Sequence, residues 1–90
     1  MIEFPEYREK AKIGDIEFEI MDLSVKFFEE VERDNELYND NNILKDGTTL
    51  TDAQILKLGN RSKLAIVNKI LDITNPDRDK NTDEEVEKKN

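Results

Sequence analysis

One segment of the chain is far more aliphatic than the rest. Residues 61–74, RSKLAIVNKILDIT, hold six Leu, Ile or Val side chains, whereas 40% of the whole chain is charged. At about 100° per residue, these six side chains spread over roughly half of a helical wheel, which is wider than an ordinary core-facing stripe. The segment therefore predicts a central helix, with Asn60 as its N-cap and Pro76 just beyond its end.

Two interpretations of this wide face remain open. In the first, a hairpin and another helix cover the whole arc. In the second, part of the arc is exposed and contacts another chain, since wide exposed aliphatic patches mark contact sites. The candidate partner-binding residues are Ile66, Ile70 and Ile73, and the residues left to face the core are Leu64, Val67 and Leu71.

The N-terminal part of the chain predicts a β-hairpin. Gly14-Asp15 forms a two-residue turn with glycine first, and the next segment alternates apolar residues with Glu17 and Glu19. Lys10 and Lys12 in the weaker first strand are expected across from these glutamates. The apolar residues of the second strand, expected in the core, are Ile16, Phe18 and Ile20.

Residues 24–38 predict a helix that covers the apolar side of this hairpin. Ser24 is a favourable N-cap, and the helix places apolar residues on one face. The core residues expected from this helix are Phe27, Phe28 and Val31. Residues 39–49 are rich in Asn and Asp and predict a loop, with Asp46-Gly47 as a turn.

Residues 51–58 predict a short helix, because Thr51 and Gln54 have the spacing of a capping box. The predicted fold is thus α+β, with an N-terminal β-hairpin packed on about three short helices. We expect residues 1–6 to be a flexible N-terminus and 7–74 to be a single small domain. Residues 75–90 contain ten charged residues of sixteen and predict a disordered charged tail.

Composition argues against several function classes. The chain has no histidine and no cysteine, so the usual acid–base shuttle, the thiol nucleophile and the commonest zinc ligands are missing. We expect no enzymatic activity, no cofactor and no metal.

A calcium-loop spacing at Asp77, Asp79, Asn81 and Asp83 lacks the glycine at position six and the glutamate at position twelve. No apolar run approaches the ~18 residues of a membrane span.

The charge is strongly negative and unevenly distributed. A net charge of −8 argues against binding of nucleic acid. Residues 14–46 hold eleven acidic and three basic residues, whereas 47–74 hold two acidic and four basic residues. These regions attract each other either within one fold or head-to-tail between copies. An alternative function is a small acidic inhibitor or nucleic-acid mimic, acting through Glu17, Glu19, Asp22, Glu29, Glu30 and Glu32.

The order of the elements resembles a known family. A charged hairpin, a helix, an Asn/Asp loop and then LTDAQILKLGNRSKLAIVNKILDITNP are similar to the tail assembly chaperones of Mu-like and related contractile-tailed phages and prophages. The resemblance covers roughly residues 10–76. The residues that carry it are Ile55, Leu58, Leu64, Val67, Ile70, Leu71 and Pro76. The family often has an acidic residue between its last two helices, where this chain has Gly59-Asn60.

This resemblance implies a non-enzymatic role in tail assembly. Such chaperones bind the tape measure protein, a long helical protein that sets tail length, until tail tube subunits polymerise around it. The implied partners are therefore the tape measure protein, the tail tube protein, a longer frameshifted form of the chain and further copies of it. The implied location is the cytoplasm of the bacterial host, and the finished virion is not expected to contain the protein.

Overall fold

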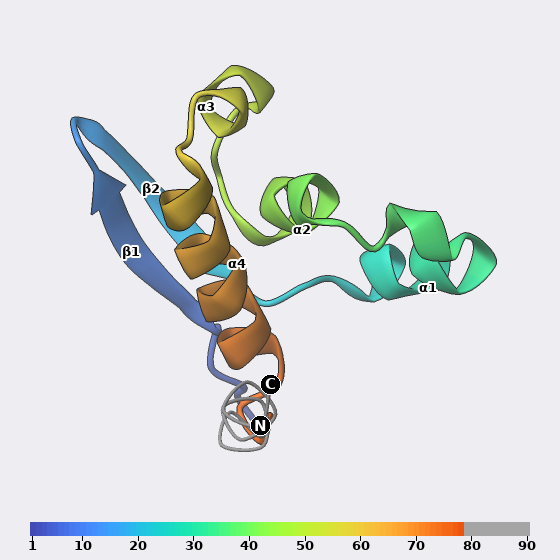
Figure 1. Cartoon of the computed structure of the whole chain (residues 1–90). Coiled ribbons are helices and arrows are strands. Elements are labelled where there is room, and N and C mark those ends of the chain that lie inside the picture. Colours follow the sequence, from blue (N-terminus) through green and yellow to red (C-terminus); the bar gives the residue numbers. More distant parts are fainter. Residues whose placement is uncertain (79–90) are drawn as a thin grey trace, which may run out of the picture.

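The computed structural model describes residues 1–78, and it has the α+β fold that the sequence predicts (Figure 1). Residues 1–6 have no helix or strand. The elements in chain order are β1 (Arg8–Ile13), β2 (Ile16–Met21), α1 (Val25–Arg33), the 3₁₀ turn η1 (Asn35–Leu37), α2 (Asp40–Gly47), α3 (Asp52–Leu56) and α4 (Asn60–Thr74). Most of the predicted charged tail, with Asp79, Asn81 and Asp83, lies outside the described residues.

β1 and β2 form the predicted antiparallel hairpin. Gly14 has a φ of 58°, which glycine adopts without strain and which a turn with glycine first requires. Lys10 pairs with Glu19 and Lys12 with Glu17, so opposite charges face each other on the solvent side of the sheet. The predicted cross-strand arrangement is confirmed.

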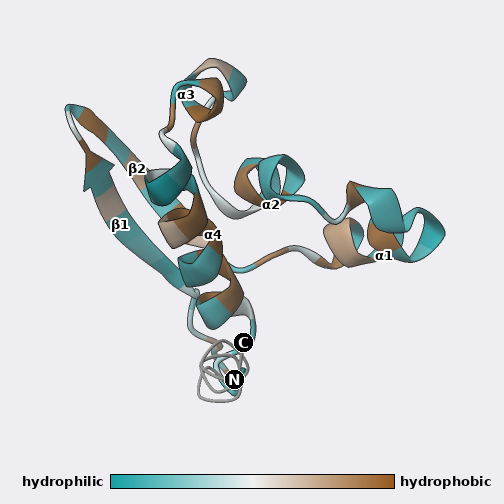
Figure 2. Ribbon diagram, in the orientation of Figure 1, coloured by the Kyte–Doolittle hydropathy of each residue, from teal (hydrophilic) through white to brown (hydrophobic). Residues whose placement is uncertain are grey.

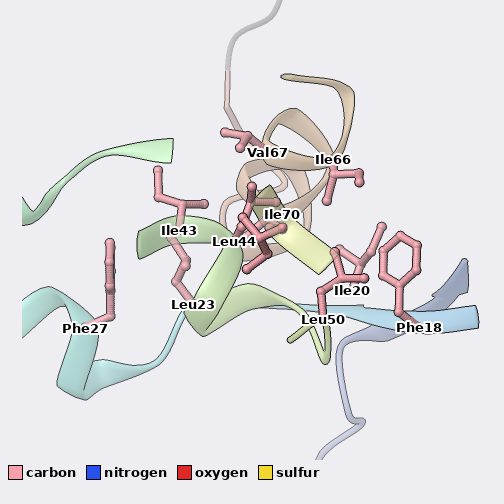
Figure 3. Close-up of a cluster of buried hydrophobic side chains, with 11 residues drawn as sticks. Phe18, Ile20, Leu23, Phe27, Ile43, Leu44, Leu50, Ile66, Val67 and Ile70 are labelled. Atoms are coloured by element: carbon pink, nitrogen blue, oxygen red, sulfur yellow. The ribbon is translucent and has the colours of Figure 1, made fainter. Parts of the chain in front are cut away.

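α4 lies along the apolar side of the hairpin, and α2 packs against another part of α4 (Figures 1 and 3). Ile70 of α4 is completely buried, and Ile66 and Val67 are nearly so. The hairpin contributes Phe18 and Ile20 to the same cluster. The other buried apolar residues are Leu23, Phe27, Ile43, Leu44, Leu50 and Ile55.

The predicted loop at 39–49 is wrong, because most of it is the helix α2. The side chain of Asn39 accepts a hydrogen bond from the backbone N–H of Asn42 at 3.0 Å, so the Asn/Asp cluster caps a helix instead of forming a loop. Ile43 and Leu44 then face the core. Gly47 does not form a turn either: it ends α2 against Ile70 of α4.

α1 does not cover the hairpin as predicted. It lies at the far side of α2, and α4 covers the sheet instead (Figure 1). Ser24 caps α1 as expected, accepting from the Phe27 N–H at 3.0 Å. Asp46 of α2 accepts from both the N–H and the hydroxyl of Ser24, at 2.7 and 2.9 Å. These bonds attach α1 to α2 and so direct it away from the sheet.

The expected core is confirmed at four positions: Phe18, Ile20, Phe27 and Val67. Ile16, Val31 and Leu71 are partly buried and pack against this core. The prediction is wrong for Phe28 and Leu64, which are 42% and 51% exposed. Phe27 takes the buried position on α1, and its ring meets Phe28 edge-on with centroids 5.7 Å apart. The buried arc of α4 centres on Ile66, Val67 and Ile70, and Leu64 lies outside it.

The capping predictions for the last two helices differ in outcome. Thr51 and Gln54 form the expected capping box of α3, with bonds of 3.2 and 2.9 Å. Asn60 is not the cap of α4: it is the first helical residue, and Gly59 stands at the N-cap without a side-chain bond. Within residues 1–78, no helix has both the length and the apolar character needed to cross a bilayer.

Candidate partner-binding groove

A groove runs along the boundary between β1 and α4. Alternate residues of a strand share one face, so Glu9, Ala11 and Ile13 of β1 are on the side that faces α4. Ser62, Ala65, Ile66, Lys69 and Ile73 form a stripe on α4, because their spacing of three and four residues places them on one side. The groove contains two hollows, of about 290 and 360 Å³, between these two rows.

The first hollow has an apolar floor, and the second is mixed. Phe18, Ile20 and Ile66 line the first hollow together with Ala11 and Ile13. Ile73, Tyr7 and Pro76 line the second, together with the charged residues Glu6, Arg8, Glu9, Lys69 and Asp72. Phe18, Ile20 and Ile66 belong to the core that holds the hairpin on α4, and Ala11, Ile13 and Ile73 pack against that core.

An ion pair stands between the two hollows. Lys69 of α4 contacts Glu9 of β1 at 3.2 Å, and Lys69 lines both hollows. Both side chains are about half exposed. In such a setting an ion pair contributes only a few tenths of a kcal/mol to stability, up to about 1 kcal/mol, so the pair adds little to the stability of the fold.

One edge of the hairpin is covered and the other borders the groove. Thr48 bridges to Ile20 of β2, and the hydroxyl of Thr49 accepts from the Glu19 N–H at 2.9 Å. In the described sheet, β1 has β2 as its partner on one side and no strand on the other. Lys10 and Lys12 lie on β1, and lysine on an edge strand discourages unspecific pairing of sheets.

The structure corrects the predicted exposed face of α4. Ile66 and Ile70 are buried, so these two residues and Ile73 do not form an open aliphatic patch. Ile70 faces Gly47 and the interior. Ile66 and the partly buried Ile73 instead form part of the groove floor, one in each hollow.

Sequence reasoning missed the β1 side of the groove. Tyr7, Ala11 and Ile13 alternate with charged residues, but the small Ala11 weakens the pattern, and nothing local shows that α4 lies beside it. Ala65 and Lys69 carried no signal except their position on the wheel beside Ile66 and Ile73. The groove can bind a row of apolar side chains. The described residues contain no cluster of three or more potential metal ligands.

The length of the groove matches a short helix. Along α4 from Ser62 to Ile73 the rise is about 16 Å, and along β1 from Tyr7 to Ile13 it is about 20 Å. Three turns of a partner helix, about 16 Å long, therefore match the groove in length. An amphipathic helix lying in an apolar groove is a recurring mode of peptide recognition.

The acidic surface of the alternative function is divided in the structure. Glu17 and Glu19 stand opposite lysines on the hairpin, and Glu19 also pairs with Arg8 at 2.6 Å. The glutamates of α1 lie on the other side of the molecule, beyond α4 and α2 (Figure 1). The six acidic residues therefore do not form one row of the kind that imitates a phosphate backbone.

Neither family models, nor curated proteins, nor solved structures gave a match to this chain.

Proposed function

We propose that this chain is a tail assembly chaperone of a contractile-tailed phage or prophage, and that its β1–α4 groove receives a helix of the tape measure protein. The observation that carries the proposal is the open apolar groove beside α4. It is formed largely by the segment that resembles the chaperone family. In this role the protein acts in the host cell before the tail is complete, and it needs no catalytic group.

The physical character of the groove suits a holding function. Its floor buries apolar side chains of a partner, which would otherwise drive the aggregation of a long amphipathic helix. Each 100 Å² of apolar surface buried in such a groove contributes roughly 2.5 kcal/mol before the entropic cost of binding. The net negative charge of the chaperone then keeps the complex soluble.

Ala65→Arg tests the groove directly. Ala65 is exposed and lines the first hollow, so a long charged side chain there fills the groove without disturbing the core. We expect co-purification of the tape measure protein of the same phage or prophage to fall at least tenfold. The matched control is Asn68→Arg, which places the same side chain at another exposed position on α4 that does not line either hollow.

Equal binding by Ala65→Arg and Asn68→Arg, both with the circular dichroism of the unsubstituted protein, would remove the groove from the proposal.

A salt titration of the complex separates the chaperone from the acidic mimic. Contact through apolar surface changes little with salt, whereas binding in place of a phosphate backbone weakens steeply.

A further inference from the structure

A stripe of residues runs along α4 beside the groove. Arg61, Leu64, Asn68 and Asp72 follow one another at spacings of three and four residues, which places them on one side of the helix. Leu64 is 51% exposed, and Arg61 and Asn68 are exposed as well. Figure 2 shows hydrophilic and hydrophobic residues alternating along α4. We call these four residues the α4 stripe.

The last described residue lies on this stripe. The Arg78 N–H donates to the Asn75 carbonyl at 3.0 Å, which closes a turn just after α4. The Arg78 guanidinium then reaches back along the helix to Asp72 at 3.6 Å and to Asn68 at 3.4 Å. Arg78 thus covers the C-terminal half of the α4 stripe, and the N-terminal half stays exposed among residues 1–78.

The N-terminal half of the stripe is basic. Residues 53–71 hold four basic residues and no acidic residue, and none of the ion pairs within residues 1–78 involves Arg61. The first turn of α4 has no acidic residue either, so the positive end of the helix dipole adds to the charge of Arg61. This end of the stripe therefore attracts carboxylates, and the exposed Leu64 beside it adds an apolar contact.

The chain beyond Arg78 has the complementary composition. Residues 83–87, DEEVE, hold four carboxylates and one aliphatic side chain. Their reach also matches. The rise along α4 from Asn75 to Arg61 is about 21 Å, whereas an extended chain covers about 17 Å from Arg78 to Asp83 and about 30 Å to Glu87. Charge, reach and starting point all favour a contact between this segment and the exposed half of the stripe.

We propose that residues 83–87 of the chain bind the N-terminal half of its own α4 stripe, with their carboxylates beside Arg61. The proposal gives a place to part of the segment that the sequence predicts as a disordered tail. Because the contact forms within one chain, its strength is independent of protein concentration, and because its charges are exposed, salt weakens it. Arg61 and Leu64 line neither hollow of the groove, so this contact does not depend on the proposed function.

A single spin label tests the contact in the full chain, because the chain has no cysteine of its own. Asn90→Cys carries a nitroxide three residues beyond the acidic stretch, and the nitroxide enhances the relaxation of nearby backbone amides. We expect at least threefold larger enhancement at the amides of residues 60–64 than at those of α1. α1 is a fair reference, because the Leu23 N–H just before it donates to Thr74 at the end of α4, so it too lies within reach of the tail.

Charge variants of the labelled chain then test the pairing. Arg61→Glu should lower the enhancement at residues 60–64 at least threefold. The matched control is Lys26→Glu, which makes the same charge change at an exposed position of α1 and should leave the enhancement as it is. Replacing the four carboxylates by amides should act like Arg61→Glu and changes no residue of the described core. These replacements are Asp83→Asn, Glu84→Gln, Glu85→Gln and Glu87→Gln.

Three results would overturn the proposal. The first is equal enhancement at residues 60–64 and at α1, and the second is the same effect from Arg61→Glu as from Lys26→Glu. The third is full enhancement in an isotope-labelled chain without nitroxide that is mixed with a chain carrying it, since this would place the contact between copies. The tape measure assay with Ala65→Arg reports on the groove, so the two proposals can fail separately.

Discussion

Gly47 shows how one absent side chain sets the distance between two helices. A Cβ built on Gly47 would lie 2.6 Å from Cγ2 and 2.9 Å from Cδ1 of Ile70, which is completely buried and cannot turn away. Gly47→Ala should therefore destabilise the fold by about 1–2 kcal/mol, because overpacking costs about 1–3 kcal/mol and the better helix propensity of alanine returns at most about 1 kcal/mol. Urea unfolding with an unchanged m-value measures this loss. Gly59→Ala is the comparison, since no atom lies within 4 Å of the added carbon there; an equal loss in both would contradict the packing explanation.

Single residues were also where sequence reasoning failed most often. Hydropathy does not distinguish Phe27 from Phe28, yet one is buried and the other half exposed, because only the tertiary contacts decide which side of α1 faces Ile43 and Leu23 (Figure 3). The sequence predicts a loop at Asn39, which is instead a helix cap. The same residue type favours both structures, since its side chain bonds to nearby backbone in either.

At the scale of elements, α1 depends on α2 for its place. The carboxylate of Asp46 accepts from the N–H and hydroxyl of Ser24, and that hydroxyl oxygen also caps α1. Asp46→Ala removes both bonds and should cost about 1 kcal/mol. We expect hydrogen exchange of the α1 amides to accelerate while the α4 amides keep their protection. Asp46→Asn retains an acceptor oxygen and should lose less; equal acceleration in α1 and α4 would show that α1 does not unfold separately.

Local signals predicted the elements unevenly. The hairpin has a glycine turn and strict alternation, and α3 has a capping box, so both could be placed from a few residues. α2 is short and mostly polar, with Ile43 and Leu44 as its only large apolar side chains. Two adjacent apolar residues fit a loop as well as a helix, and the Asn39 cap together with packing against α4 decides for the helix.

At the scale of the whole molecule, one hydroxyl joins distant parts of the chain. Thr74 at the end of α4 accepts from the Leu23 N–H at 2.9 Å and donates to the Ile70 carbonyl at 2.8 Å. Thr74→Val keeps the shape but leaves the partly buried Leu23 N–H without this acceptor, which should cost about 1–3 kcal/mol. Thr74→Ser keeps the hydroxyl, and we expect most of the stability to remain. Thermal unfolding compares the two, and equal midpoints would mean that water replaces the bond.

The candidate groove could not be predicted as a whole, because it forms where separate segments meet. The wheel of residues 61–74 identified an apolar arc, and that arc does form the centre of the fold. It could not show that the hairpin and α2 would together bury Ile66 and Ile70. The excess of aliphatic surface that suggested an exposed patch is used to hold two neighbours, and what stays accessible is the narrow boundary beside β1.

The ion pair between Lys69 and Glu9 would also affect how a partner helix is aligned along the groove. A helix lying along the proposed groove would meet the Lys69–Glu9 pair between the two hollows. If it slid by one turn, a bulky aliphatic residue would come against those charges, whereas the correct alignment would place a small or polar residue there. Two ordinary surface residues would thus act as a reference mark that selects one alignment from the several that a long, repetitive helix offers.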